Sequence, residues 1–173
     1  TQARTDLARD IATVSDMYAK EAGISPRDLA KVLGGIAVIE SRFGVLRRVT
    51  GTAYESSAGG ALHYLNRTIA GETTQAMSDP RVASRVNALG VNIANGVSAE
   101  EAWTLKEDNV LALSLLSRRI VRTLREHPEL KDNPVMLATR VYQAHNLGDA
   151  GANALARGGR FALEALDHKA AAN

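Results

Sequence analysis

Glu40 is the residue whose type and spacing point most directly to chemistry. It lies four positions after Ile36 and three before Phe43, so the three side chains share one face of a helix. That face is otherwise apolar, which directs the carboxyl toward the core or toward the floor of a cleft. Loss of surrounding water disfavours a charged carboxylate, and a neutral carboxylic acid is the form that donates a proton in general acid catalysis. The alternative is that Glu40 ends the stripe and reaches solvent, or pairs with Arg42 or Arg47.

Three segments of the chain, in order, contain motifs that are weak singly and more specific together. Residues 39–44 are Ile-Glu-Ser-Arg-Phe-Gly, and residues 56–65 are Ser-Ser-Ala-Gly-Gly-Ala-Leu-His-Tyr-Leu. Residues 141–152 are Val-Tyr-Gln-Ala-His-Asn-Leu-Gly-Asp-Ala-Gly-Ala. The first segment resembles the Glu-Ser-x-Phe signature of lysozyme-like lytic transglycosylases, and the second resembles their Ser-Ser-Ala-x-Gly turn. The third resembles their Ala-Tyr-Asn-x-Gly motif and also the Tyr-x-Ala-His-Phe-Leu-Gly form of a branch found in phage virion proteins.

The resemblance implies an all-α, lysozyme-like helical domain with a glycan-binding cleft, acting as a peptidoglycan lytic transglycosylase. In such an enzyme Glu40 would protonate the β-1,4 glycosidic oxygen between MurNAc and GlcNAc. The same carboxylate would then take the proton of the sugar's own C6 hydroxyl, which closes a 1,6-anhydroMurNAc ring without a second carboxylate. Glu55 is the acid nearest to the second motif and is interpreted as an exposed loop residue.

Three substrate-binding positions are implied in the second motif. Ser57 corresponds to a serine that faces the catalytic glutamate, although it could also cap the following helix. Gly60 would let the backbone approach a sugar closely, or could form a plain turn. His63 stands where the family usually has glutamine. Histidine can still donate and accept hydrogen bonds, but it becomes charged in acid.

The third motif supplies three more candidates, Tyr142, His145 and Asn146. Tyr142 and His145 are three positions apart, so both can face one side of their helix. Either could hold the Glu40 carboxyl in place, or the pair could be a packed tyrosine and a surface histidine. Asn146 agrees with the Tyr-Asn form of the motif and departs from the form that has phenylalanine.

The elements that must position these residues are helices. Aromatic residues make up only 4% of the chain while Ala, Leu and Arg are abundant, which favours helices over sheets. We expect one domain over residues 1–173. Periodicity and capping signals predict helices over residues 6–22, 26 to about 44, 58–70, 134–146 and 160–169, with a loop at 51–56. They also predict a helix that begins at Pro80 and a long helical region that follows the capping box at 98–101.

Composition argues against several classes of protein and site. No apolar run approaches the roughly 20 residues of a membrane span. Cysteine is absent, and the four histidines show no His-x-x-x-His spacing, so neither a metal nor another cofactor is expected. The arginines at 118, 119, 122 and 125 are interpreted as a solvated helix face, with weak attraction to an anionic polymer as the alternative. No aromatic interleaving supports a nucleic-acid partner.

The leading interpretation is therefore an enzyme whose partner is the glycan strand of peptidoglycan. Its location would be the periplasm or cell envelope, or a phage virion, within a larger assembly in either case. Two alternatives stay open. The same scaffold could hydrolyse the glycan like a lysozyme, or it could be a degenerate family member that only binds peptidoglycan or has a structural role. His63 favours degeneracy, and Glu40 in its apolar setting opposes it.

Overall fold

The chain is all-α, as its composition predicts. The computed structural model describes residues 1–45 and 57–156. Within these ranges the β-type pairing is an isolated bridge between Gly59 and Tyr64. The elements are α1 (Gln2–Ala22), α2 (Pro26–Ser41), α3 (Asn66–Ala76), α4 (Pro80–Ala88), α5 (Ala99–Glu107), α6 (Asn109–Glu126), the short 3₁₀ helix η1 (Pro128–Asp132) and α7 (Pro134–Ala156).

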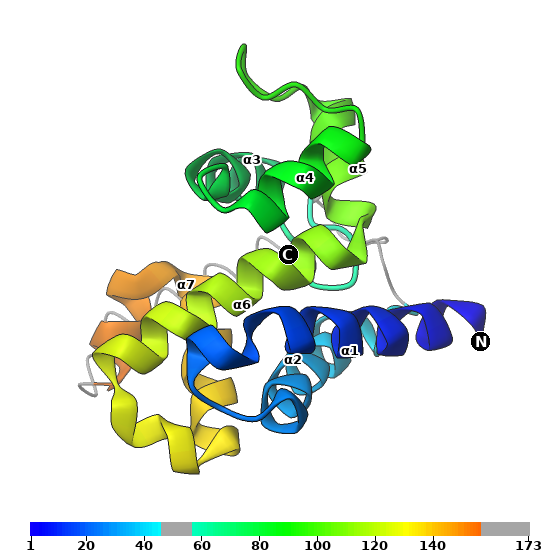
Figure 1. Cartoon of the computed structure of the whole chain (residues 1–173). Coiled ribbons are helices and arrows are strands. Elements are labelled where there is room, and N and C mark those ends of the chain that lie inside the picture. Colours follow the sequence, from blue (N-terminus) through cyan, green and yellow to red (C-terminus); the bar gives the residue numbers. More distant parts are fainter. Residues whose placement is uncertain (46–56, 157–173) are drawn as a thin grey trace, which may run out of the picture.

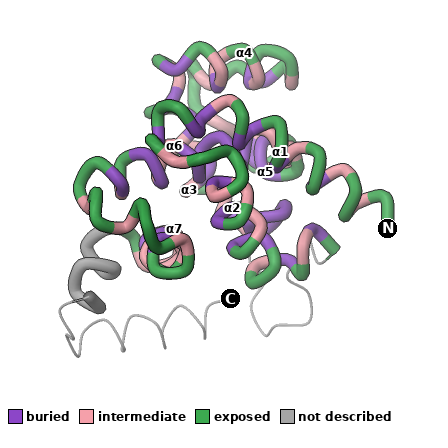
Figure 2. The backbone as a smooth tube through the Cα atoms, turned by 60° about the horizontal axis from the view of Figure 1, so that its bottom comes forward, coloured by how far each residue is buried: buried purple, intermediate pink, exposed green. Residues whose placement is uncertain are grey.

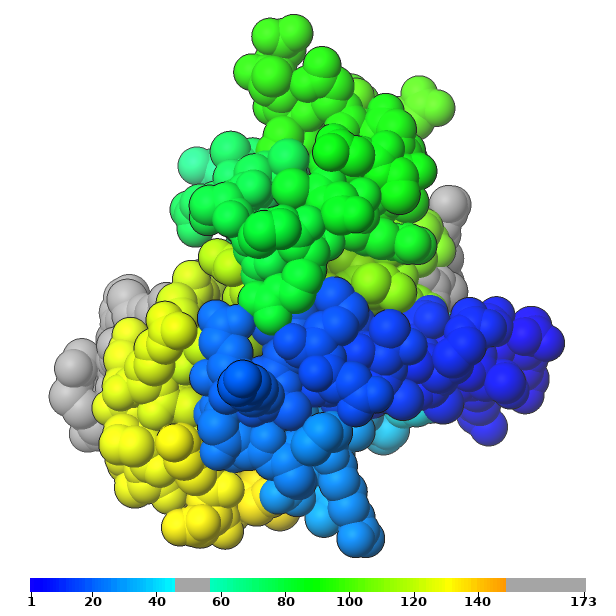
Figure 3. All heavy atoms as spheres, viewed as in Figure 1, coloured from blue at the N-terminus to red at the C-terminus, as the bar shows by residue number. Residues whose placement is uncertain are grey.

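Helix α6 crosses the middle of the molecule, and the other helices gather around it (Figure 1). Its most extensive contacts are with α1, and α2 packs against both α1 and α7. Helices α3, α4 and α5 lie on the opposite side of α6 from α1 and α2 (Figure 1). In the space-filling view this green segment projects above the blue and yellow body (Figure 3). The packing of α2 on α7 brings the first and third sequence motifs together.

Capping residues begin several helices where the sequence predicts. The Ser25 side chain accepts a hydrogen bond from the Asp28 amide before Pro26 opens α2, and Asp79 accepts from the Arg81 amide before α4. Ser98 forms the predicted capping box at the start of α5. These side chains satisfy amides of the first turn, which have no partner within the helix.

The predicted helix over residues 58–70 is wrong. Helix α3 begins at Asn66 and continues through Gly71 to Ala76. The preceding residues form a turn instead, in which Gly60 and His63 have positive φ angles of 76° and 48°. A helix requires negative φ, so this segment cannot join α3.

Two other predicted boundaries also differ from the structure. The region after residue 98 is two helices, because the Asp108 side chain accepts from the Leu111 amide and begins a new helix, α6. Helix α2 ends at Ser41, and Arg42 and Phe43 take left-handed conformations. Phe43 therefore does not continue the helical face of Glu40, as the spacing predicts.

The end of the helix at Gly148 is only partly as predicted. Gly148 has φ 73° and ψ 168°, which interrupts α7 at a kink, but the helix resumes and extends to residue 156. The predicted loop at 51–56 and the predicted helix at 160–169 lie outside the described residues, as does Glu55.

The core is formed by the apolar faces of the helices, and α6 contributes more buried residues to it than any other helix (Figure 2). The predicted stripe of α6 is buried throughout: Leu113, Leu116, Ile120 and Leu124 are each at most 2% exposed. Full burial of such a side chain contributes about 1.5–3 kcal/mol relative to exposure. No helix among the described residues is both long and apolar enough to cross a membrane.

Two arginines of α6 point inward, contrary to the prediction of a solvated face. Arg118 lies 3.0 Å from the Asp79 carboxylate, and Arg119 lies 2.8 Å from Glu72. The side chain of Arg119 is only 11% exposed. Charge runs of this kind usually face water, but here carboxylates of α3 and of the α4 cap lie opposite α6 and pair with them.

Candidate active site

The second motif is a turn held by helices from both ends of the chain. The Ser41 hydroxyl, at the end of α2, donates to the Ala61 carbonyl at 2.7 Å. The His145 Nε2 of α7 lies 2.8 Å from the Leu62 carbonyl. Since a carbonyl oxygen only accepts hydrogen bonds, Nε2 carries the proton of this imidazole. The three sequence motifs therefore meet at one place.

Helix α5 supports the other side of this turn. A Cβ atom on Gly59 would lie 2.2 Å from the Trp103 ring, and one on Gly60 would lie 2.0 Å from the Lys106 carbonyl. Only glycine fits at either position. The buried Lys106 ammonium donates to the Ser57 carbonyl and lies 3.6 Å from the centre of the Trp103 ring, within cation–π range.

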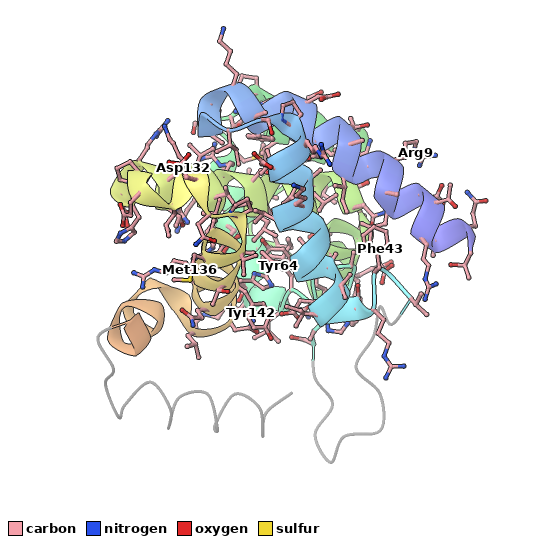
Figure 4. The ribbon with its side chains drawn as sticks, turned by 90° about the horizontal axis from the view of Figure 1, so that it is seen from below. Arg9, Phe43, Tyr64, Asp132, Met136 and Tyr142 are labelled. Atoms are coloured by element: carbon pink, nitrogen blue, oxygen red, sulfur yellow. The ribbon has the colours of Figure 1, made fainter. Side chains whose placement is uncertain are left out.

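A cavity of about 250 Å³ opens where α2, α7 and the turn meet. In Figure 4, Tyr64 lies between α2 and α7, and Tyr142 lies on α7. The cavity is lined by Ile39, Glu40, Ala58, His63, Tyr64, Leu65, Thr68, Tyr142, His145 and Asn146. The structure thus brings Glu40 together with four of the six binding residues predicted from sequence: His63, Tyr142, His145 and Asn146.

Among the described residues, the Glu40 carboxyl accepts a hydrogen bond at one of its two oxygens. The Asn146 side-chain amide donates to Oε1 at 3.1 Å and also to the Tyr142 carbonyl at 3.1 Å. The other carboxyl oxygen, Oε2, lies 3.6 Å from Nδ1 of His63. The Glu40 side chain is 10% exposed and that of His63 is 15% exposed. Because Oε1 already accepts a hydrogen bond, Oε2 is the oxygen placed to carry a transferable proton.

His145 supports the turn from behind the cavity. Burial lowers the pKa of its imidazole, against the raising effect of the Glu40 charge, so the ring is neutral near pH 7. Its edge packs on the Tyr64 ring, with centroids 4.7 Å apart. His145 therefore does not hold the Glu40 carboxyl, which was one of the roles considered for it. It positions the Leu62 carbonyl beside His63.

Tyr142 contributes to the site in two ways. Its carbonyl orients the Asn146 amide that holds Glu40. Burial and the nearby Glu40 charge raise the pKa of its phenol, so the hydroxyl keeps its proton at neutral pH. The phenol is a potential hydrogen-bond donor to a ligand in the cavity.

Ser57 and Gly60 are not among the residues that line the cavity. The Ser57 hydroxyl accepts from the amide of Asn66, the first residue of α3, at 3.2 Å. Ser57 thus binds the first turn of α3, but the N-cap residue of that helix is Leu65 and not this serine. The close approach that Gly60 permits is to the Lys106 carbonyl and not to the cavity. The substrate-binding role predicted for these two residues has no support from this placement.

Several residues that build the site were missed in the sequence. The Tyr64 hydroxyl donates to Glu72 at 3.2 Å, and Arg119 binds the same carboxylate. Lys106 and Ser41 fix the turn from two sides. Only Ser41 had a local signal, as the second residue of the Glu-Ser-x-Phe motif. Tyr64 lies within the second motif, but its spacing gives no sign of Glu72. Lys106, Glu72 and Arg119 lie on helices whose partners are distant in sequence.

A separate apolar groove of about 510 Å³ lies beside the cavity, between α2 and α7. The two hollows share Ile39 and Tyr142 as lining residues. The rest of the groove is lined mainly by Gly35, Ile36, Pro134, Val135 and Ala138. An apolar surface is therefore adjacent to the cavity.

The chemistry available in this cavity is proton transfer. Among the described residues no group of three or more His, Cys, Asp or Glu side chains is arranged to hold a metal ion. A carboxyl with one free oxygen, a facing imidazole and a protonated phenol can protonate, deprotonate and bind hydroxyl groups. Comparisons of the chain with protein-family models, with curated proteins and with solved structures give no match, so its function has to be inferred from the residues of this site.

Proposed function

We propose that this protein is a peptidoglycan lytic transglycosylase of the lysozyme-like type, with Glu40 as general acid and base. The observation that carries the proposal is the Glu40 carboxyl in the cavity wall, with Oε1 held by Asn146 and Oε2 available. The three motifs that resemble this family supply the substrate class, and their residues meet at the cavity.

The reaction would begin with protonation of the glycosidic oxygen by Glu40 Oε2. The bond from the anomeric carbon to that oxygen breaks, and an oxocarbenium-like state develops at the sugar. The C6 hydroxyl of the same sugar then attacks, which closes the 1,6-anhydro ring. Because that nucleophile is part of the substrate, no water has to be positioned, and the effective molarity is high.

The surroundings of the cavity suit a polymeric glycan. Tyr142 and His63 can hydrogen-bond hydroxyl and N-acetyl groups, and the apolar groove beside them can accommodate the less polar faces of a longer strand. A formal net charge of +2 is compatible with an anionic polymer. We place the protein at the cell envelope or in a phage virion, within a larger assembly.

A zymogram with purified peptidoglycan tests whether the protein is an enzyme. We expect a cleared band, and mass spectrometry of the soluble products should show 1,6-anhydroMurNAc ends, lighter by one water than hydrolysed ends. Predominantly reducing ends would indicate a lysozyme-type hydrolase on the same site. Binding to peptidoglycan without clearing would indicate a degenerate, structural family member and would contradict the proposal.

A further inference from the structure

We propose that His63 is a second proton-transfer residue: after Glu40 has protonated the leaving oxygen and the glycosidic bond has broken, His63 accepts the proton of the attacking C6 hydroxyl in place of the Glu40 carboxylate. This inference rests on the glycan-cleaving function proposed above. It goes beyond a substrate-binding role for His63, because it gives the imidazole a step that a glutamine at the same position could not perform.

The geometry of the carboxyl points to this division of work. Asn146 donates to Oε1 of Glu40, so the transferable proton belongs on Oε2. Nδ1 of His63 faces that same oxygen at 3.6 Å. Proton transfer needs heavy atoms about 2.6–3.2 Å apart or one bridging water, and catalytic contacts are often longer before substrate binds.

The backbone holds His63 in a conformation that a histidine adopts rarely. Its φ is 48°, in the left-handed region that is uncommon for residues other than glycine. Such conformations persist where the surrounding structure imposes them, and they cluster at functional sites. Here the neighbouring carbonyls of Ala61 and Leu62 are bound by Ser41 and His145. The turn therefore keeps the imidazole at the cavity wall.

The other titratable groups around the pair are poor proton acceptors. His145 of α7 uses its Nε2 proton on the Leu62 carbonyl, and its Nδ1 is buried. Tyr142 keeps its proton because burial and the Glu40 charge raise the pKa of its phenol.

Tyr64 also lines the cavity, but its hydroxyl is committed to a carboxylate. The Tyr64 hydroxyl and Arg119 of α6 both bind the Glu72 carboxylate of α3. Among the described residues that line the cavity, Glu40 and His63 are the two titratable side chains that face each other, with Oε2 and Nδ1 3.6 Å apart.

The reaction balances with these two groups alone. Glu40 gives one proton to the leaving oxygen as the bond from the anomeric carbon breaks. The attacking C6 hydroxyl forms the new bond to that carbon and loses its proton to His63. The imidazolium then returns this proton to the Glu40 carboxylate, which restores both groups, and nothing is oxidised or reduced.

The short separation also fits an internal nucleophile. Two carboxyls of a glycosidase lie about 5–5.5 Å apart in retaining enzymes and about 6.5–9.5 Å apart in inverting ones, where water attacks the opposite face. At 3.6 Å the Glu40 and His63 groups serve one face of the sugar. In a β-linked hexopyranose the leaving oxygen and the C6 group lie on the same face, so both are within reach of the pair.

The test compares His63→Gln and His63→Ala with the wild-type protein on purified peptidoglycan strands over a range of pH. Glutamine keeps the hydrogen bonds to substrate but cannot take up a proton. We expect kcat to fall about 10²-fold or more in both variants, with little change in KM for the glutamine variant. Because the imidazole can take up a proton and the glutamine amide cannot, the pH profiles of kcat should differ between the wild type and the glutamine variant.

His127→Gln is the matched control. His127 also faces a glutamate, with Nδ1 3.2 Å from Glu129, but outside the cavity at the protein surface. We expect its activity and pH profile to equal those of the wild type.

Wild-type kcat and an unchanged pH profile in His63→Gln would overturn the inference and leave His63 a binding residue. Absence of cleavage by the wild-type protein would instead overturn the proposed function, and the His63 step with it. Should His63→Gln fail to fold, imidazole NMR titration of the wild type and of Glu40→Gln decides. We expect the His63 ring to titrate differently in the two proteins, and identical titration would overturn the pairing.

Discussion

Asp79, at the start of α4, and Glu40, near the end of α2, are carboxylates with little exposure, since their side chains are 2% and 10% exposed. Both oxygens of Asp79 are saturated. Oδ1 accepts from the Arg81 amide and guanidinium, and Oδ2 accepts from Tyr18, Arg81 and Arg118 at 2.9–3.1 Å. Glu40 has one hydrogen bond to Oε1 and an imidazole at 3.6 Å from Oε2.

This difference separates a structural carboxylate from a chemical one. The guanidinium groups and the Tyr18 hydroxyl outweigh the burial of Asp79 and hold the pKa of its carboxyl well below the usual range. Such a group stays ionised and joins α1, α4 and α6. Glu40 lines a cavity and has one carboxyl oxygen, Oε2, that accepts no hydrogen bond from the described residues. A proton donor requires such an oxygen, and a structural ion pair does not.

The largest expected effect is that of Glu40→Gln on catalysis. The amide keeps the shape and can still accept the Asn146 hydrogen bond, but it has no proton to give, so activity should fall by at least about 10²–10⁴-fold. Turnover on peptidoglycan and circular dichroism together measure this. Glu129→Gln, at an exposed position, is the control. A folded Glu40→Gln variant that turns over normally would remove Glu40 from the mechanism.

Asp79→Asn should show the opposite pattern, a large loss of stability with intact chemistry in the folded fraction. The substitution removes the counter-charge of Arg118 and one of the two carboxylates that bind Arg81, which keeps Glu21. Both guanidinium groups are about a third exposed, so the loss of these charged hydrogen bonds should cost about 1–3 kcal/mol. Urea unfolding at pH 7 measures the cost. A loss below about 1 kcal/mol would show that the cluster resembles an ordinary surface ion pair.

The same variant should lose part of its acid sensitivity. Because the pKa of Asp79 is depressed in the folded state, its contribution is fully present above about pH 4, near the value for an unfolded chain, and is lost as pH falls further. The wild-type stability should therefore fall more steeply below pH 4 than that of Asp79→Asn. Parallel curves would contradict the assignment.

Asn146→Ala is expected to have a smaller effect on turnover than Glu40→Gln. It frees Oε1, so the carboxyl can rotate away from the reacting oxygen, and misplacement of a catalytic group by about 1 Å can cost on the order of 10²-fold. Kinetics on peptidoglycan should show a lower kcat with little change in thermal stability. Unaltered kcat would mean that packing alone positions Glu40.

Ser57→Ala should have the smallest effect. It removes a hydrogen bond to the first amide of α3, which is worth about 1 kcal/mol of stability by analogy with helix caps. Activity per folded molecule should stay at the wild-type level. A drop in kcat without loss of stability would return Ser57 to the substrate-facing role that its motif implies.

Much of the helical framework was predictable from local signals. Ser25-Pro26, Asp79-Pro80 and the capping box at 98–101 each begin a helix as expected, because a cap is an interaction between residues two or three positions apart. The helix predicted from residue 58 begins only at Asn66, although the composition of residues 58–65 suits a helix. The conformation of that segment depends on Trp103 and Lys106, some 40 positions later, whose packing admits only glycine at 59 and 60.

By itself the sequence determined that the chain is helical, because periodicity and capping act over a few residues. It placed Glu40 on a largely apolar helix face but left open whether the carboxyl reaches solvent. Only the tertiary structure decided which partners that carboxyl has. Asn146, which donates a hydrogen bond to Glu40, lies 106 positions later in the sequence. The position of His63 opposite Glu40 depends on a turn that is bound by α2, α5 and α7. Contacts of this kind follow from how whole helices pack, and no local pattern of residues encodes them.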